Sequence, residues 1–407
     1  MEEWKEYKLG ELCNTISDTY KRRAKEVVLI NTSDVLEGKC MNHERVLNEK
    51  LKGQFKKTFQ YNDILYSEIR PANKRFAFVD FDATDYIAST KLMVLRHNDI
   101  IIPQYLFYIL KSQNVIDELQ MLAESRSGTF PQITFSELSN LSVLLPNKDL
   151  QYRIVSILSS LDDKIEVNRR INEQLEELAG ALFKSWFVDF EPFKDGEFVD
   201  SELGMIPRGW KVGTLGELCI TNKRTYGAKF ANEIAYLDTG SVTKNQIEGF
   251  QILNPEVDKI PSRARRAVTE GDILFSSVRP NQKHYAFLFA PQTNMVASTG
   301  FIVITANWSG YRYFIYQYLI QEEIIDKLQA IAEQSVSTYP SINASDITNL
   351  KLVIPPMDII GKFAGMNLAF MSEIDKNQQE ITQLTTLRDT LLPKLMSGEI
   401  DVNLFNV

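Results

Sequence analysis

The sequence predicts an α+β protein built from two copies of one architecture, each copy a mixed α/β domain followed by a long helix. Two observations predict it: sequence blocks recur in the same order at a constant spacing, and two stretches of about 40 residues carry a coiled-coil heptad pattern. We expect a first domain at 1–146, a central helix at 147–190, a linker at 191–209, a second domain at 210–355, and a distal helix and tail at 356–407.

The repeat covers nearly the whole chain. DILYSEIRP at 63–71 recurs as DILFSSVRP at 272–280, and from there onward the spacing stays at 209 residues. WKEYKLGELC recurs as WKVGTLGELC, IDELQMLAE as IDKLQAIAE, and TFPQI as TYPSI. Agreement in both order and spacing indicates a duplicated structure.

Within each domain, short runs rich in β-branched and aromatic residues alternate with Gly, Pro and Asn. These runs, at 27–30, 64–67, 76–79 and 92–95 and at the matching positions of the second copy, predict strands. Apolar spacing then predicts a helical stretch at 103–123 and its partner at 311–332.

The period changes after Pro146. Asn147 is a favourable N-cap, and a heptad ladder runs from Ile154 to Trp186, with its counterpart from Phe363 to Leu395. Each helix should be a rod of roughly 60 Å. Pro393 is expected to end or kink the second rod early.

The two helices should run antiparallel. The linker at 191–209 looks irregular and would have to be almost fully extended to let the helices run parallel. A symmetric antiparallel register, related by a pseudo-twofold axis, gives contacting residue numbers that sum to about 549. It places Asn172 opposite Asn377, where a buried pair would fix the register; the alternative is that one or both face solvent.

Composition argues against a membrane protein, a secreted protein and a zinc protein. The 407 residues contain no apolar run of the roughly 20 residues that a membrane span needs, and the charged N-terminus has no signal-peptide core, so we expect a cytoplasmic protein. Three cysteines and three histidines offer no zinc spacing; Cys40 with His43 is the nearest approach.

Charge is unevenly distributed. The net charge is -8, and residues 147–199 hold 7 basic against 11 acidic side chains, while 356–407 hold 4 against 7. The two domains are close to neutral and carry local basic clusters interleaved with Asn, Gln, Tyr and Ser. Such clusters suit phosphate positioning and base-edge readout in DNA.

Catalytic signatures are missing. The sequence has no Walker A loop, no G-x-G-x-x-G, no H-E-x-x-H and no N-P-P-Y. Asp189, Glu191 and Lys194 have a nuclease-like spacing, but they are better interpreted as solvated charges. Enzymatic activity in this chain alone is not expected.

The order of domain, helix, domain, helix resembles the specificity subunit of type I restriction-modification systems. The D-I-L-[YF]-S-x-x-R-P blocks, LFKSWFVDFEPF, PRGW and LLPKLMSGEI carry the resemblance, which spans essentially the whole chain. It implies two target recognition domains, each reading one half of a split double-stranded DNA site. It also implies two modification (adenine methyltransferase) subunits and restriction subunits as partners, with S-adenosylmethionine, ATP and Mg²⁺ bound only by those partners.

Duplication sorts the candidate DNA-binding residues. Residues common to both copies should be scaffold or shared phosphate contacts, and Arg70 and Arg279 fall in this group. Residues that differ should distinguish the half-sites: Lys21, Arg22, Arg23, Lys56, Lys57, Lys74, Arg75 and Arg126 in the first domain, and Lys223, Arg224, Tyr226, Arg263, Arg265, Arg266, Lys283 and His284 in the second.

Two other function classes compete with this interpretation. A coiled-coil adaptor whose end domains bind proteins would tolerate charge reversal in the basic clusters. A self-contained nuclease or methyltransferase would show turnover as a purified single chain.

Overall fold

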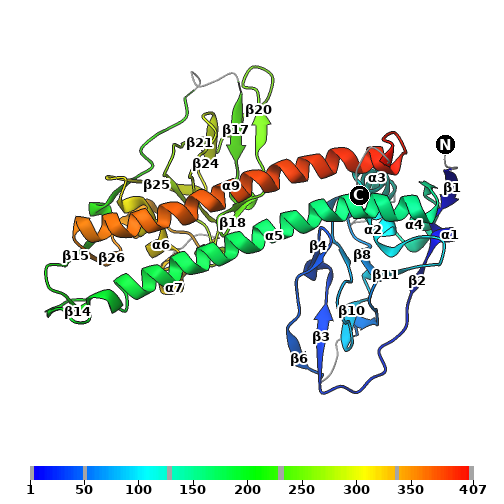
Figure 1. The fold of residues 1–407 in the computed structure, drawn as a ribbon, viewed down its shortest axis with the longest axis horizontal. Coiled ribbons are helices and arrows are strands. Elements are labelled where there is room, and N and C mark those ends of the chain that lie inside the picture. The colour runs from blue at the N-terminus through cyan, green and yellow to red at the C-terminus, as the bar shows by residue number, and fades with distance from the viewer. Residues whose placement is uncertain (1–3, 49–52, 126–130, 228–232, 335–338, 403–407) are drawn as a thin grey trace. The chain divides into compact units, whose positions relative to one another are not determined.

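The computed structural model describes residues 4–48, 53–125, 131–227, 233–334 and 339–402 (Figure 1). The chain forms two compact units. Unit 1 comprises residues 1–165 and 383–407, and unit 2 comprises 166–382, so each unit takes one segment from each long helix.

In unit 1 the elements follow the predicted α+β order. They are β1 (Lys5–Lys8), α1 (Leu9–Leu12), β2 (Cys13–Ile16), β3 (Glu26–Ile30), η1 (Thr32–Asp34), β4 (Val35–Leu36), β5 (Lys39–Cys40), β6 (Arg45–Leu47), β7 (Phe55–Lys57), β8 (Ile64–Ser67), η2 (Pro71–Asn73), β9 (Phe76–Phe78), β10 (Tyr86–Ser89), β11 (Leu92–His97), α2 (Pro103–Lys111), α3 (Gln113–Glu124), α4 (Phe135–Ser139) and β12 (Ser142–Leu145).

Unit 2 repeats this order. After η3 (Glu191–Phe193) and the hairpin β13 (Phe198–Ser201) to β14 (Gly204–Pro207) come β15 (Lys211–Thr214), η4 (Leu215–Glu217), β16 (Cys219–Thr221), β17 (Ile234–Leu237), η5 (Thr239–Ser241), β18 (Val242–Thr243), β19 (Gln246–Ile247), β20 (Gln251–Leu253), β21 (Ala264–Ala267), β22 (Ile273–Ser276), η6 (Pro280–Gln282), β23 (Tyr285–Phe287), β24 (Met295–Ser298), β25 (Phe301–Ala306), α6 (Tyr311–Leu319), α7 (Glu322–Glu333), α8 (Ala344–Thr348) and β26 (Lys351–Ile354).

Both units have the same sheet topology. An antiparallel sheet of order β2-β11-β8-β9 in unit 1 matches β16-β25-β22-β23 in unit 2. A second, mixed sheet of order β6-β3-β10-β7 matches β20-β17-β24-β21, and in each the two central strands are parallel. The duplicated α+β class predicted from the sequence is confirmed.

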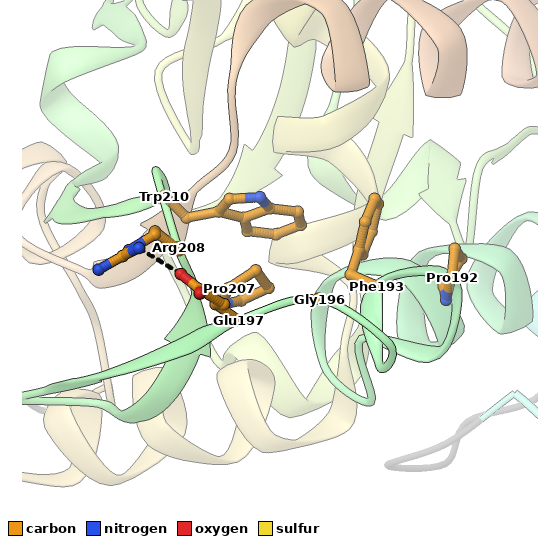
Figure 2. Close-up of a pocket in the computed structure, with 7 residues that line it drawn as sticks. All are labelled: Pro192, Phe193, Gly196, Glu197, Pro207, Arg208 and Trp210. Carbon is orange, nitrogen blue, oxygen red and sulfur yellow. Dashed lines mark hydrogen bonds and ion pairs between the residues drawn. The ribbon is translucent and has the colours of Figure 1, made fainter.

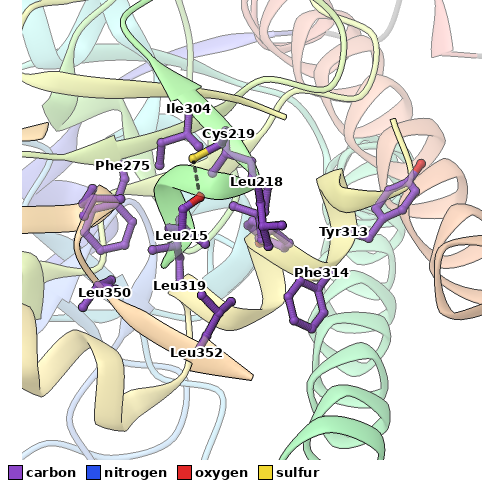
Figure 3. Close-up of a cluster of buried hydrophobic side chains, with 14 of the residues drawn as sticks. Leu215, Leu218, Cys219, Phe275, Ile304, Tyr313, Phe314, Leu319, Leu350 and Leu352 are labelled. Atoms are coloured by element: carbon purple, nitrogen blue, oxygen red, sulfur yellow. Dashed lines mark hydrogen bonds between the residues drawn. The ribbon is translucent and has the colours of Figure 1, made fainter. Parts of the chain in front are cut away.

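The repeated D-I-L block is a scaffold strand. All four residues of β8 are buried; Ile64 and Tyr66 face the helices, whereas Leu65 packs with the second sheet. The same alternation in β22 sends Phe275 into the helix-side core, drawn with Leu215, Leu218 and Phe314 in Figure 3. A strand buried on both faces has a continuous apolar run in its sequence, which explains why this block is the same in both copies.

Each domain is closed by its own first and last strands. β1 pairs antiparallel with β12, Lys5 lying opposite Leu145, and β15 pairs with β26 in the same way. The repeated WKEYKLGELC and WKVGTLGELC blocks begin with one of these strands, so the repeat boundaries meet in space.

Three local expectations are corrected. The stretch 103–123 is two helices, because Ser112 is extended and its hydroxyl donates to the carbonyl of Ile109. Between α6 and α7 the matching residue, Gln321, is also extended, and its side-chain amide donates to the carbonyl of Gln317. The linker is not irregular throughout, since it holds η3 and the β13–β14 hairpin. Pro393 does not end the distal helix early, because it lies in the last turn, where the carbonyl of Pro393 still accepts from the amide of Ser397 at 3.0 Å.

The long helices α5 (Lys148–Phe187) and α9 (Met357–Met396) are both 40 residues long and begin at equivalent positions. Within each unit a segment of α5 lies against a segment of α9 and the two run antiparallel (Figure 1), with contacts such as Asp162 to Arg388 in unit 1 and Asn172 to Asn377 in unit 2. Asn147 caps α5, its side-chain oxygen accepting from the amide of Leu150 at 3.0 Å.

The predicted register of the helices is confirmed. In unit 2, Asn377 Nδ2 donates to Asn172 Oδ1 at 2.8 Å, and both side chains are buried. Asn172 Nδ2 also donates to the carbonyl of Ile374 at 3.3 Å. The alternative in which these asparagines face solvent is excluded, and the pair can set the register because a slip would leave buried amides unbonded.

In unit 1 the domain meets the helices through a charged cluster, which we call the first junction: Tyr108, Lys111, Asp162 and Arg388. Asp162 accepts from Tyr108 and Lys111 of α2 and from Arg388 of α9, each at 2.8 Å. Burial by itself would raise the pKa of Asp162, but Lys111 and Arg388 hold that pKa below its ordinary value. The cluster is therefore an ion network rather than a single pair.

In unit 2 the corresponding contact, the second junction, is built on Glu176 of α5. Its Oε1 accepts from Asn245 Nδ2 at 2.5 Å and from the Tyr316 hydroxyl at 3.1 Å. Oε2 is buried and has no hydrogen-bond partner among the described residues. Burial raises the pKa of Glu176 to about 7, although the two donors favour the charged form.

This raised pKa predicts a pH-dependent stability of unit 2. The folded state holds a proton on Glu176 that the unfolded chain releases near its ordinary pKa, so stability is fully present below about pH 4.5 and falls by up to about 3 kcal/mol as pH rises to about 7. Glu176→Gln, which mimics the protonated acid, should remove this loss and raise the melting temperature at pH 8 but not at pH 4.5. Thermal unfolding across that range checks it, with Glu177→Gln on the exposed face as the control; equal pH profiles for Glu176→Gln and the parent would contradict it.

Candidate nucleic-acid interface

A basic turn occurs at the same place in both domains, directly after the scaffold strand. Arg70 and Lys74 flank η2, and Arg279 and Lys283 flank η6. All four have left-handed backbones, with φ of 46°, 52°, 47° and 57°. Such conformations are uncommon for residues other than glycine and cost on the order of 1 kcal/mol or more each.

The surrounding structure holds each turn in this shape. The amide of Arg70 donates to the carbonyl of Pro131 at 3.1 Å, and the amide of Arg279 donates to that of Pro340 at 3.0 Å. Gln120 of α3 accepts from the amide of Ala72 at 3.1 Å, and Gln329 of α7 does the same for Asn281 at 3.2 Å.

Gln120 and Gln329 were not among the predicted site residues. They occupy the same place in the repeated IDELQMLAE and IDKLQAIAE blocks, so the repeat itself carried the signal. The strained turn is thus a duplicated feature in which two basic side chains are kept at positions that glycine would occupy with less strain.

The turn changes how two candidates are sorted. Lys74 and Lys283, taken as divergent residues, are the same residue type at equivalent positions and share one backbone conformation. They belong with Arg70 and Arg279. Each lysine lies near an acid, Lys74 at 3.7 Å from Glu37 and Lys283 in an ion pair with Glu322.

The next residue in each domain holds a neighbouring loop. Arg75 Nη1 donates to the carbonyls of Ser33 and Val35 at 3.0 and 3.3 Å. His284 Nδ1 lies 2.5 Å from the carbonyl of Val242, the position that matches Val35. These two side chains differ, but both are engaged by backbone of the loop that carries β4 or β18.

Arg224 is engaged by a buried carboxylate. Its Nη2 contacts Asp272, whose side chain is 1% exposed, at 2.5 Å. In unit 1 the matching Asp63 is held instead by Arg96 of β11, through Nε and Nη2 at 2.7 Å each. Position 305, which matches Arg96, is a threonine whose hydroxyl donates to Asp272 at 2.6 Å.

Two further candidates are partly withdrawn from solvent. Lys57 Nζ donates to the carbonyls of Thr90 and Leu92 at 3.1 and 2.7 Å, and burial lowers its pKa. Arg266 on β21 is half-buried, and burial lowers its pKa as well. Its Nε is buried without a hydrogen-bond partner in the described part of the chain.

Most of the remaining candidates lie at the surface. Arg22 is 64% exposed and lies 3.4 Å from Asp85, Arg265 Nε donates to the carbonyl of Ser262, and Tyr226 is partly buried. Arg126 lies outside the described residues. The exposed members are Lys21, Arg22, Arg23, Lys56, Lys223, Arg263 and Arg265, besides Arg70 and Arg279 of the turns.

Other kinds of site find little support in the described residues. They contain no group of three or more His, Cys, Asp or Glu that could hold a metal ion. His43 uses its two ring nitrogens on the Tyr86 hydroxyl and the carbonyl of Cys40. Glu191 and Lys194 form an exposed ion pair at 2.6 Å. None of the helices described is long and apolar enough to span a membrane.

A pocket of about 450 Å³ lies beside the linker in unit 2 (Figure 2). Phe193 and Trp210 line it, together with the ion pair between Glu197 and Arg208. Apart from that self-paired couple its lining offers no charge, so we assign no ligand to it.

Comparison with known proteins identifies the family. Residues 1–177 and 207–388 match the family model described as "Type I restriction modification DNA specificity domain". The chain is 33% identical to the type I restriction enzyme HindI specificity subunit of Haemophilus influenzae, over 98% of this chain and all of the relative. It is 30% identical to the MjaIX specificity subunit of Methanocaldococcus jannaschii, over 75% of this chain and 70% of the relative.

A solved structure shares the fold. The type I restriction-modification S subunit from M. genitalium superposes with a TM-score of 0.53 at 17% identity, covering 97% of this chain and 96% of that one. This likeness supports the duplicated architecture described above.

Proposed function

Because this chain belongs to the family of type I restriction-modification DNA specificity subunits, which recognise DNA sequence, we propose that each of its two domains reads one half of a bipartite double-stranded DNA site. The observation that carries this proposal is the strained basic turn present in both domains. A conformation that disfavours arginine and lysine, yet holds them four times, supports one shared role for these side chains in both domains.

The turns and the surrounding side chains have different tasks in this proposal. Arg70, Lys74, Arg279 and Lys283 bind DNA phosphates, because identical residues cannot tell two half-sites apart. The exposed, unlike residues read bases: Lys21, Arg22, Arg23 and Lys56 in the first domain, and Lys223, Arg263 and Arg265 in the second. Phosphate contacts fix position and base-edge contacts give sequence specificity.

The helices are the proposed docking surface for partners. We place two modification (methyltransferase) subunits and the restriction subunits there, with S-adenosylmethionine, ATP and Mg²⁺ bound by those partners and no catalysis by this chain. Two features support this: the acidic composition of 147–199 and 356–407, and exposed apolar side chains on both helices, among them Val167 and Leu178 of α5 and Leu368 and Leu387 of α9. With DNA as its target, the complex would act in the cytoplasm.

Coexpression with the modification (methyltransferase) subunit of the same restriction-modification system tests the proposal. Mapping methylated adenines across the host DNA should return one split sequence, and replacing residues 1–146 with the domain of a relative should change one half of it. Methylation without a split recognition sequence, or a change in both halves together, would refute the assignment and favour a protein-binding adaptor.

A further inference from the structure

The two junctions between domain and helices differ in chemistry although the fold is the same. Each residue of the first junction has an equivalent in unit 2, found by the spacing of 209 residues. Tyr108, Lys111, Asp162 and Arg388 correspond to Gln317, Ile320, Met371 and Ala179.

In unit 2 none of the four ion-network groups is retained. Met371 and Ala179 are 1% and 0% exposed and belong to the apolar core, where Ala179 replaces the cation and Met371 the carboxylate. A carboxylate placed at position 371 would be buried here without the two cations that surround Asp162, and an ammonium placed at position 320 would lose Asp162 and have only Glu176 nearby, so either is unfavourable.

Conversely, Glu176 and its two hydrogen-bond donors are not retained in unit 1. Its equivalent in unit 1 is Thr385, and its donor Tyr316 corresponds to Phe107, which has no hydroxyl. Its other donor, Asn245, corresponds to Gly38: the amide of Asn245 donates to the carbonyl of Tyr285, and the amide of Gly38 to that of Phe76, 209 residues earlier. The first domain therefore lacks both groups that satisfy Glu176.

We infer that the first domain is keyed to its own position on the helices, so that it cannot occupy the second position without loss of stability. There, Lys111 would face Met371 and Ala179, and Glu176 would face Phe107 and Gly38. The converse exchange is milder, because Asp162 and Arg388 would still pair with each other at 2.8 Å beside Gln317 and Ile320. The inference concerns stability alone and would survive failure of the proposed half-site assignment.

Full-length chimeras test this keying. In the first chimera, residues 4–146 replace 210–355, which puts the first domain in both positions; in the matched chimera, residues 210–355 replace 4–146. We expect the first to melt roughly 10 °C below the parent chain, as the loss of the matched buried partners of Lys111 and Glu176 would cause in a unit of this size. The matched chimera should melt closer to the parent.

Repair of the junction separates keying from a general failure to fold. In the first chimera, Glu176→Thr with Ala179→Arg and Met371→Asp rebuilds the first junction and should recover at least about half of the lost melting temperature. The same three substitutions in the parent chain should lower its stability. A first chimera as stable as the parent, or a repaired chimera that melts no higher than the unrepaired one, would overturn the inference.

Discussion

Replacing Arg70, Lys74, Arg279 and Lys283 with asparagine should weaken DNA binding by the assembled complex by about 10³-fold at roughly 0.1 M salt. Each hydrogen bond to a charged group contributes about 1.5–3 kcal/mol, so even partial removal of four such bonds gives an effect of this size. Asparagine is chosen because it tolerates the left-handed backbone of the two turns, which keeps their shape while removing the charge.

Salt dependence identifies what these side chains bind. If all four bind phosphates, the negative slope of log K against log salt concentration should decrease in magnitude by about 0.9 for each phosphate that the variant no longer neutralises. The recognised sequence should not change, because the turns are common to both domains. Titration of DNA at several salt concentrations, with methylation mapping of the variant, measures both.

The matched control removes as many charges elsewhere. Lys148, Lys164, Lys362 and Lys376 are exposed on the long helices, and their replacement by glutamine should leave the salt slope near that of the parent. An equal fall in affinity in this control, or an unchanged slope in the turn variant, would show that the turns do not bind phosphates.

Arg224→Met should destabilise unit 2 by about 3–5 kcal/mol, because it leaves the carboxylate of Asp272 buried without its cation. Asp272 keeps the amide of Thr269 and the hydroxyl of Thr305 as donors, which places the effect toward the lower end of that range. Denaturant unfolding measures the change, and Lys223→Met at the exposed neighbour should have little effect.

The first domain supplies the rescue for this variant. There the cation comes from Arg96, at the position that matches Thr305, so Thr305→Arg in the Arg224→Met background should restore most of the stability. If Arg224→Met instead unfolds like the parent but weakens DNA binding, Arg224 is a DNA contact and not a structural cation.

The prediction that worked best from sequence was the helix register. Heptad periodicity and the constant spacing of 209 residues were sufficient to bring Asn172 and Asn377 together, because a seam position is set by local periodicity. The prediction for Pro393 failed because the effect of a proline depends on its distance from the helix end. That end, at Met396, could not be located from the sequence.

The candidate DNA-binding surface could be predicted from the sequence less well than the helix register. Which of two adjacent basic residues, Lys223 or Arg224, meets a buried aspartate depends on how β16 registers against β25, which no local pattern encodes. Composition likewise could not show that Lys57 binds backbone carbonyls or that Arg70 and Lys74 are held in a left-handed turn. These assignments depend on contacts between segments distant in sequence.

The pairing of β1 with β12 has a consequence for how such a gene can change. Because the first and last strands of a domain lie against each other, two crossovers near codons 4–8 and 142–146 would exchange the domain as one cassette and leave both long helices intact. Recombination at these two places can therefore replace the first domain in a single event.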